Sequence, residues 1–328
     1  MRDASTAEGR PDHHVVLSGP ERDELSAHAR ELTRTPPALV DDGKWLAAAE
    51  GLAAAVPLRV RRAVRRFQHD PGEDGVLLLS NLWLDPGALP PTPARPGAVE
   101  REATLPAATQ VLIAMCLGEL VAYQNEKGGA LVQNVVPVRG QEESQSNAGS
   151  ELLAMHTENA FHPHRPDYVM LMCLRNDHEN RAALQTGPLR RALPHLPAAV
   201  RDALRRPRFV TEAPPSFSAS GAKDLHHAVL NGSPDNPDII VDFHATRALD
   251  AEGRRALDAL REQLVAAERK FVLATGDLAV LDNRVTLHGR SEFVPRYDGR
   301  DRWLHRTFVH LDARRSLGAR VGDSQVIE

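Results

Sequence analysis

The chain has 328 residues, of which 42% are hydrophobic, and a formal net charge of −4. This balance gives no reason to expect binding to nucleic acid or to an anionic membrane. No stretch reaches the roughly 18 consecutive apolar residues of a membrane helix, and the polar N-terminus lacks the apolar region of a signal peptide. The two cysteines, Cys116 and Cys173, lie in apolar runs. We therefore expect a cytoplasmic protein with reduced thiols and no cysteine-rich zinc site.

The first part of the chain is patterned mainly as helices. Residues 1–17 are polar and predict an irregular lead-in. Apolar residues recur at helical spacing, and we expect helices over 20–33, 44–56, 59–68 and 107–123. Between the last two, an apolar run over 75–84 predicts a buried strand, and the Pro-rich residues 85–97 predict a surface loop.

The second part of the chain is patterned mainly as strands. Short runs rich in β-branched residues alternate with turns, and we expect strands at 130–138, 167–174, 238–244, 270–275, 278–283 and 303–311, with helices at 188–206 and 250–269. Helices gathered early and strands spread over the later part favour an α+β fold. Its core is predicted to be a double-stranded β-helix, a cupin-like jelly roll, with flanking helices.

The stretch HTENAFHPH, residues 156–164, concentrates three histidines and a glutamate. Side chains at i and i+2 of a strand share a face, so His156 and Glu158 are expected to point the same way. Together they offer two-thirds of the 2-His-1-carboxylate triad that binds Fe(II). A jelly roll takes its third ligand from a later strand, and His288 follows in GDLAVLDNRVTLHGR. We expect His162 and His164, around Pro163, to support the site or the fold.

Other candidate sites have less support in the sequence. With 15 histidines, a His-x-Asp/Glu pair is expected about once or twice by chance. A second copy, His310 and Asp312, is followed by a charged tail without another histidine, so we interpret it as a strand end. The stretch HENRA at 178–182 lacks the second histidine of a zinc-protease helix, and neither a nucleophilic serine elbow nor a phosphate-binding loop occurs.

Two arginines fall on one face of the last predicted strand, DRWLHRTFVHL. Alternation places Arg302 and Arg306 on one face, about 13 Å apart along an extended strand. Buried arginines are unfavourable without anions, and a guanidinium fits a carboxylate through two hydrogen bonds. From this stretch alone, a pair of surface arginines remains the alternative. Together with His156, Glu158 and His288, a site for two carboxylates becomes the better interpretation.

Two blocks of sequence resemble a known family. HTENAFHPHRPDYVMLMCLRN and GDLAVLDNRVTLHGRSEFVPRYDGRDRWLHRTFV are similar to the clavaminate synthase-like branch of Fe(II)/2-oxoglutarate-dependent dioxygenases. The resemblance is nearest to hydroxylases of free amino acids, such as asparagine oxygenase and arginine 3-hydroxylase, and covers roughly residues 75–312. It implies Fe(II), 2-oxoglutarate and O₂ as the reacting partners. The implied reaction is hydroxylation of Cβ or Cγ of a free polar or basic L-amino acid, Arg/Lys-like or Asn-like, in natural-product biosynthesis.

The resemblance also assigns residues. It implies that the iron ligands are His156, Glu158 and His288, and that Arg302 binds the far carboxylate of 2-oxoglutarate.

On the substrate side, Arg306 matches the arginine that binds the α-carboxylate, and Asp242 matches the acid that reads the side chain. Gln124, in the run QNEKGG, is a candidate for the α-amine, and Glu158 is a further candidate for a substrate contact. From the residues alone, Asp242 could instead cap the end of its strand.

The sequence departs from the family pattern at three places. Asn159 stands where relatives commonly have aspartate after the His-x-Glu pair. Ala182–Ala183–Leu184 occupies the window of two threonines, one of which bonds 2-oxoglutarate, so one cosubstrate hydrogen bond is in doubt. Ile240 replaces the second acid of arginine-specific relatives, which weakens a strict arginine assignment.

We expect a single catalytic domain over 1–328, with helical support at 1–74 and the jelly-roll core at 75–312. The segment 208–238 is long, polar and rich in Gly, Ser and Pro, and is expected to form a lid over the substrate; an ordinary surface excursion is the alternative. On it, Glu212 or Asp224 could supply a second acid.

Several other functions stay open on the sequence. Within the family they are desaturation, or action on a carrier-bound amino acid. Outside it they are a non-catalytic cupin-like protein that binds metal or ligand, and a zinc hydrolase. Neither of the last two needs Arg302.

Overall fold

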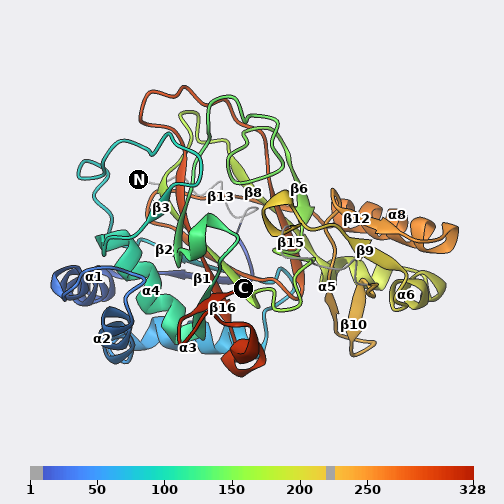
Figure 1. The fold of residues 1–328 in the computed structure, drawn as a ribbon, viewed down its shortest axis with the longest axis horizontal. Helices are drawn as coiled ribbons and strands as arrows, with labels where there is room; N and C mark the ends of the chain where they lie inside the picture. The colour runs from blue at the N-terminus through green and yellow to red at the C-terminus, as the bar shows by residue number, and fades with distance from the viewer. Residues whose placement is uncertain (1–9, 219–225) are drawn as a thin grey trace.

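The computed structural model describes residues 10–218 and 226–328 (Figure 1). The helices are α1 Gly19–Arg34, α2 Gly43–Ala53, α3 Leu58–His69, α4 Leu105–Leu117, α5 Leu189–Ala192, α6 Ala198–Leu204, α7 Pro215–Ser218 and α8 Ala251–Ala266, with 3₁₀ helices η2 Lys127–Gly129, η3 Leu193–His195 and η4 Ala313–Ala319. The strands of the large sheet are β1 His13–Val16, β2 Val76–Ser80, β3 Val99–Glu100, β4 Glu119–Tyr123, β5 Val132–Val135, β7 Tyr168–Arg175, β14 Leu278–Asp282, β16 Trp303–His310 and β17 Val326–Ile327.

The smaller sheets are built from the middle of the chain. The strands of the four-stranded sheet are β6 Leu153–His156, β8 Ala183–Pro188, β13 Arg269–Val272 and β15 Thr286–Arg290. Two further two-stranded sheets join β9 Phe209–Thr211 to β12 Thr246–Ala248 and β10 Leu230–Gly232 to β11 Pro237–Ile239.

Two sheets facing each other form the jelly-roll core, as the sequence predicts for the fold class. The large sheet runs β1-β2-β14-β7-β16-β4-β17, with β5 on β16 and β3 on β5, and the four-stranded sheet runs β13-β8-β15-β6. A cluster of buried side chains fills the space between them, with Leu304 and Phe308 from β16 opposite Leu184 and Phe271. Side chains of alternate residues on these strands therefore point into a shared interior.

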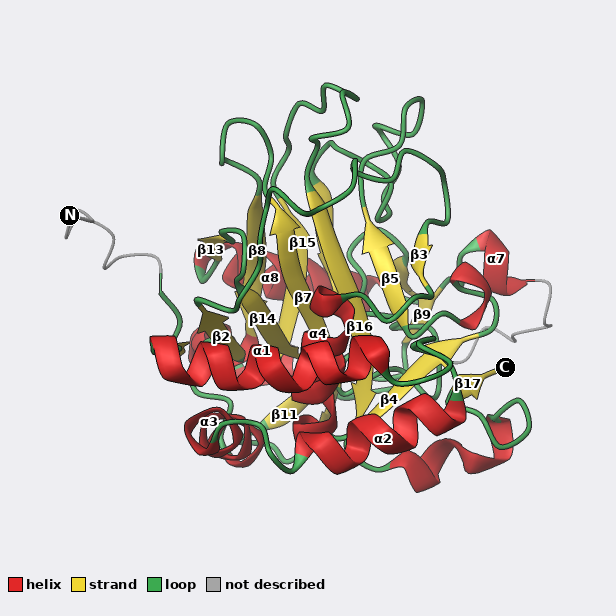
Figure 2. Ribbon diagram, turned by 90° about the vertical axis from the view of Figure 1, so that its left-hand side faces the viewer, coloured by secondary structure: helices red, strands yellow, loops and turns green. Residues whose placement is uncertain are grey.

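Helices cover the outer face of each sheet (Figures 1 and 2). The largest core cluster packs α1–α4 against the large sheet, with Trp45, Phe67 and Trp303 among its members. A third cluster packs α5, α6 and α8 against the outer face of the four-stranded sheet, through residues such as Leu260 and Leu287. The interior between the sheets is thus supported from both sides.

The helix predicted over 107–123 is wrong beyond residue 117. Gly118 ends α4, and the chain continues as β4, which pairs with β16 through Val121 and Phe308. A Cβ at Gly118 would lie 2.3 Å from the carbonyl oxygen of His310. The break therefore lies where helix and strand approach too closely for any side chain.

Three other elements differ from the prediction. The lead-in forms β1, which pairs in parallel with β2. The helix expected over 188–206 is divided into α5, η3 and α6, because Pro194 and Pro197 lack the amide that a continuous helix needs. The strand expected over 238–244 ends at Ile239, and beyond it Asp242 forms an isolated bridge with His156.

The segment predicted as a lid, 208–238, contains more regular structure than expected. Its described parts form β9, α7, β10 and β11, and residues 219–225 lie outside the described residues. Phe217 of α7 packs against the interior cluster between the sheets, 4% exposed. Among the described residues, no helix is both long and apolar enough to cross a membrane.

Candidate active site

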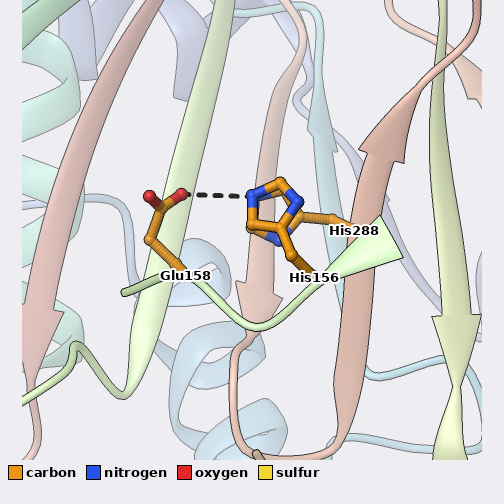
Figure 3. Close-up of side chains that lie close together, drawn as sticks. All are labelled: His156, Glu158 and His288. Atoms are coloured by element: carbon orange, nitrogen blue, oxygen red, sulfur yellow. Dashed lines mark ion pairs between the residues drawn. The ribbon is translucent and has the colours of Figure 1, made fainter. Parts of the chain in front are cut away.

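Three ligand-type side chains meet in the interior between the two sheets (Figure 3). His156 at the end of β6 and His288 on β15 are direct cross-strand partners, and their ring centroids are 4.4 Å apart. Oε2 of Glu158 lies 3.3 Å from Nε2 of His288. One ligand atom from each residue lies within 4.8 Å of the other two. The structure therefore brings together His156, Glu158 and His288, which lie up to 132 positions apart (288 − 156).

The sequence predicted that Glu158 shares a strand with His156, but in the structure Glu158 lies beyond the end of that strand. Strand β6 ends at His156, and the next residue, Thr157, is held by a hydrogen bond from its N–H to the Val241 carbonyl, 2.7 Å. The Glu158 side chain still points toward both histidines (Figure 3). The convergence thus depends on tertiary contacts after the strand rather than on strand alternation.

The donor set fits a divalent metal. Nδ1 of His156 is 2.9 Å from the Ala154 carbonyl, which places the proton there and leaves Nε2 as the ligand atom. Burial lowers the pKa of His288, with help from nearby His156, so its imidazole stays neutral. Glu158 Oε2 and His288 Nδ1 are buried without a hydrogen-bond partner among the described residues. Two neutral imidazoles and a carboxylate are the ligands of non-haem Fe(II) sites.

Arg306 joins this triad to a second group of polar side chains. It is 4% exposed, and its Nη1 donates to Oε1 of Glu158 at 3.0 Å and to Oδ1 of Asn147 at 3.3 Å. Nε donates to Gln133 at 3.1 Å, and Nη2 donates to Glu126 and Gln133. Burial would raise the pKa of Glu158, but the charge of Arg306 outweighs it, and the pKa lies well below the usual range.

Gln124, the predicted contact for an α-amine, does not reach this group. Its side chain is exposed, and its backbone N–H bonds to Ile327 of β17. Glu126, two residues later in the same polar run, contacts Arg306 instead. Within QNEKGG, the structure therefore places Glu126 rather than Gln124 beside Arg306. The sequence did not single out Glu126, because a loop has no fixed periodicity that would choose among its side chains.

Arg302 is buried without an anionic partner among the described residues. It is 5% exposed and makes no hydrogen bond or ion pair with the described residues. Its guanidinium carbon lies 5.8 Å from the ring centroid of Phe293, and that of Arg290 lies 5.5 Å from the same ring. Burial lowers the pKa of Arg302 from its ordinary value. A buried guanidinium without a carboxylate marks a place where an anionic ligand would be stabilised.

Asp242 lies next to the triad. Its backbone pairs with His156 in an antiparallel bridge, so the two side chains lie on the same face. Oδ1 accepts hydrogen bonds from the N–H groups of His244 and Ala245, at 2.7 and 3.2 Å. Oδ2 has no hydrogen-bond partner among the described residues, so Asp242 both caps a turn and keeps one acceptor oxygen available.

His162 and His164, the remaining histidines of the 156–164 motif, contact other parts of the fold rather than the triad. The His162 ring packs edge-on against Tyr123 at 4.9 Å, and its Nε2 lies 3.3 Å from the Glu328 carbonyl. The His164 carbonyl lies 3.1 Å from Nε2 of His310, whose partner in the second His-x-Asp copy, Asp312, caps η4. Neither the pair His162 and His164 nor the pair His310 and Asp312 belongs to the triad.

Glu212, in the segment predicted as a lid, is exposed and pairs with Arg247 at 3.6 Å, while Asp224 lies outside the described residues. The window 182–184 carries no hydroxyl, and the first hydroxyl on β8 belongs to Thr186, directly across from His288. Its Oγ1 is buried without a partner in the described structure.

Comparisons with known proteins point to one family. Residues 106–308 match the family described as "Taurine catabolism dioxygenase TauD, TfdA family". L-asparagine oxygenase of Streptomyces coelicolor is 49% identical over 287 residues, 88% of this chain and 86% of that protein. Clavaminate synthase 2 of Streptomyces clavuligerus is 35% identical over 320 residues, 94% and 97% of the two chains.

A solved structure is similar over nearly the whole chain. It is asparagine oxygenase in complex with Fe(II), 2S,3S-3-hydroxyasparagine and succinate. The two chains are 46% identical, and they superpose with a TM-score of 0.93 over 96% of this chain and 99% of the other.

Proposed function

The chain belongs to the TauD/TfdA family of dioxygenases, and from this premise we propose that it hydroxylates free L-asparagine. It is an Fe(II)/2-oxoglutarate-dependent hydroxylase of a polar or basic amino acid, as its relatives are. The observation that supports a free amino acid as substrate is the pairing of Arg306 with Glu126 beside the triad, and the choice of asparagine rests on the one available oxygen of Asp242. A cation and an anion side by side suit the carboxylate and ammonium groups of a free amino acid.

In this proposal, the metal is held by His156, Glu158 and His288. Bound iron supplies the chemistry: with 2-oxoglutarate and O₂ it forms succinate, CO₂ and an alcohol from a C–H bond. The protein contributes the geometry. It keeps the His288 imidazole neutral by burial and keeps Glu158 ionised through the charge of Arg306.

Arg302 is proposed to bind the far carboxylate of 2-oxoglutarate. The support is its burial without a hydrogen bond or ion pair in the described structure, and its position directly before β16, four residues before Arg306. A cosubstrate with a carboxylate at each end can reach the metal with one end and this guanidinium with the other. The lack of a hydroxyl at 182–184 leaves more of that binding to the guanidinium.

Arg306 and Glu126 are proposed to bind the two charged groups of the amino acid. The Arg306 guanidinium would take the α-carboxylate through two hydrogen bonds. Glu126, whose side chain is 16% exposed, would take the α-ammonium group. Because Glu126 and Glu158 bind Arg306, its guanidinium is oriented before the substrate arrives. The substrate carboxylate would then compete with these two side chains for the same guanidinium.

Asp242 is proposed to accept a hydrogen bond from the substrate side-chain amide. Its Oδ2 is the available acceptor, because the turn at His244 and Ala245 occupies Oδ1. A single free oxygen suits an amide better than a guanidinium, which a second acid would help to hold. At the position where arginine-specific relatives are expected to have that second acid, this chain has Ile240, 8% exposed. Fixing both ends of asparagine would place Cβ over the metal.

We further propose that the whole chain acts as one catalytic domain, with the 208–238 segment as its lid. Phe217, packed against the interior cluster, gives this segment a contact close to the core. Cys116 and Cys173 are both free thiols, and this supports the cytoplasmic location expected from the sequence.

The test is a panel of the common L-amino acids with purified protein, Fe(II), 2-oxoglutarate and O₂. Product is scored by a mass gain of one oxygen, and succinate is measured in parallel. We expect L-asparagine to give the highest kcat/KM, with the oxygen on Cβ. Faster turnover of arginine, lysine or an apolar amino acid would contradict the role given to Asp242.

The metal site has its own test, without turnover. Fe(II) and 2-oxoglutarate, added without O₂, should produce a weak visible charge-transfer band. His288→Ala should remove the band. Correctly folded wild-type protein that gives no band would contradict the whole assignment.

A further inference from the structure

The backbone of Glu158 is held at both of its polar groups by one side chain. The Glu158 N–H donates to Oδ1 of Asn283 at 2.8 Å, and Nδ2 of Asn283 donates to the Glu158 carbonyl at 3.2 Å. Asn283 is 1% exposed. An amide side chain therefore makes the pair of hydrogen bonds that a neighbouring strand would otherwise make.

Glu158 needs such a partner because of its position in the chain. The ladder between β6 and β15 ends at His156, and the N–H of Thr157 bonds to Val241 on another segment. No strand in the described part of the chain pairs with Glu158 itself. Without Asn283, two buried backbone groups would lack hydrogen bonds, and the ligand carboxylate would sit on a segment with few constraints.

Asn283 also connects Glu158 to the strand that carries the second histidine. It lies in the turn between β14 and β15, five residues before His288. Its Nδ2 makes a second hydrogen bond, to the Pro166 carbonyl at 2.9 Å, and its own N–H bonds to the Asp167 carbonyl at 2.9 Å. The turn that begins β15 is thereby fastened to residue 158 within the 156–164 motif and to residues 166 and 167 just after it.

We propose that Asn283 is a positioning residue of the metal centre. By fixing the Glu158 backbone relative to β15, it holds the carboxylate so that one oxygen faces His288 and the other faces Arg306. This inference rests on the metal site proposed above. Replacing Asn283 should weaken metal binding directly, in addition to any effect on folding.

The experiment compares metal affinity with stability in the metal-free protein. Mn(II) is titrated into wild-type and Asn283→Ala protein, and bound metal is followed by electron paramagnetic resonance. We expect the affinity to fall about 10- to 100-fold, as for other residues that orient ligands. Cobalt(II)-substituted protein should show an altered visible spectrum in the variant, because the geometry of the carboxylate changes.

The control is Trp45→Phe, which removes a different buried donor. Nε1 of Trp45 donates to the Leu32 carbonyl at 2.9 Å in the helical layer outside the large sheet. This variant should lose stability but keep the wild-type Mn(II) affinity and cobalt spectrum. If Asn283→Ala is too unstable to purify, Asn283→Ser, with room for a water molecule, replaces it.

The outcomes separate this inference from the proposed function. Wild-type protein that binds no Mn(II) contradicts the metal site itself. Wild-type protein that binds Mn(II) no more tightly than Asn283→Ala or Asn283→Ser, with the same cobalt spectrum, overturns only the role of Asn283.

Discussion

Replacing Arg302 by methionine should change stability and cosubstrate binding in opposite directions. Arg302 is buried, and no carboxylate or carbonyl of the described residues binds it. Methionine keeps most of the unbranched stem and removes the charge. Without a cosubstrate, the wild-type protein therefore carries a desolvation cost that Arg302→Met avoids.

The size of both effects follows from the contacts. Replacing a poorly compensated buried charge with an apolar group often stabilises by about 1–4 kcal/mol. For a chain of this size, each kcal/mol raises Tm by about 1–2 °C. Conversely, two charge-assisted hydrogen bonds to 2-oxoglutarate contribute about 1.5–3 kcal/mol each. Their loss should weaken cosubstrate binding by about 10²- to 10⁴-fold.

The assay is thermal unfolding of the metal-free protein, followed by titration of 2-oxoglutarate into the Mn(II)-loaded protein by calorimetry. The buffer must lack phosphate and carboxylates, since either could occupy the guanidinium. We expect a higher Tm for Arg302→Met than for wild type, and no measurable heat of 2-oxoglutarate binding.

Arg290→Met is the matched control. Arg290 is also 5% exposed, but its guanidinium donates to the Glu151 carbonyl at 2.8 Å and to the Ser146 carbonyl at 3.4 Å. This variant should lose stability. A fall in Tm for Arg302→Met equal to that of Arg290→Met, or unchanged binding of 2-oxoglutarate, would refute the reasoning.

Three further predictions concern the substrate, the pH dependence and the β6–β15 contact. Asp242→Asn keeps an oxygen for the turn but replaces the free acceptor with a donor, so KM for L-asparagine should rise about 10- to 100-fold in steady-state assays; an unchanged KM would exclude the contact. Burial raises the pKa of Glu100 to about 7, above its value in the unfolded chain, so its contribution to stability is present at low pH and is lost as pH rises through 7. At pH 8 the free energy of unfolding of Glu100→Gln should therefore exceed that of wild type by about 1–2 kcal/mol after solvent screening. In thermal unfolding the two proteins should converge near pH 4, and a difference that is constant with pH would contradict this. A Cβ on Gly289 would lie 2.5 Å from the Leu153 carbonyl oxygen. Gly289→Ala should therefore lower the free energy of unfolding by about 1–3 kcal/mol and weaken Mn(II) binding. A variant with wild-type unfolding and wild-type Mn(II) affinity would show that β6 and β15 can separate freely.

Much of the architecture was predictable because strand and helix periodicities are local properties of the sequence. Alternation correctly separated Leu304 and Phe308, which face the interior between the sheets, from Trp303, which packs in the outer core. The jelly roll could be expected from many short strands. Periodicity failed at Gly118, where the apolar pattern continues but a close approach to the neighbouring strand ends the helix.

The sequence indicated the residues of the site that belong to recognisable motifs, and not those that reach it from loops. His156 and His288 were identifiable from their motifs, and they prove to be cross-strand partners. Glu126 and Asn147 lie in loops, where no period indicates which side chain turns inward. Asn283 acts on a backbone rather than on a ligand atom, so its role is visible only once the fold brings residue 158 beside it.

The alternation along β16 has a consequence for how this protein can tolerate insertions and deletions. Arg302 and Arg306 face the interior, while His305 between them is completely buried on the opposite face, next to the helical layer. Inserting or deleting one residue between positions 302 and 306 would turn one arginine into the hydrophobic core and bring an apolar side chain into the charged site. Length changes should therefore survive in the 291–301 loop before the strand but not within the strand. New substrate preferences would then arise by point substitution around a β16 of fixed length, or by remodelling of the loops.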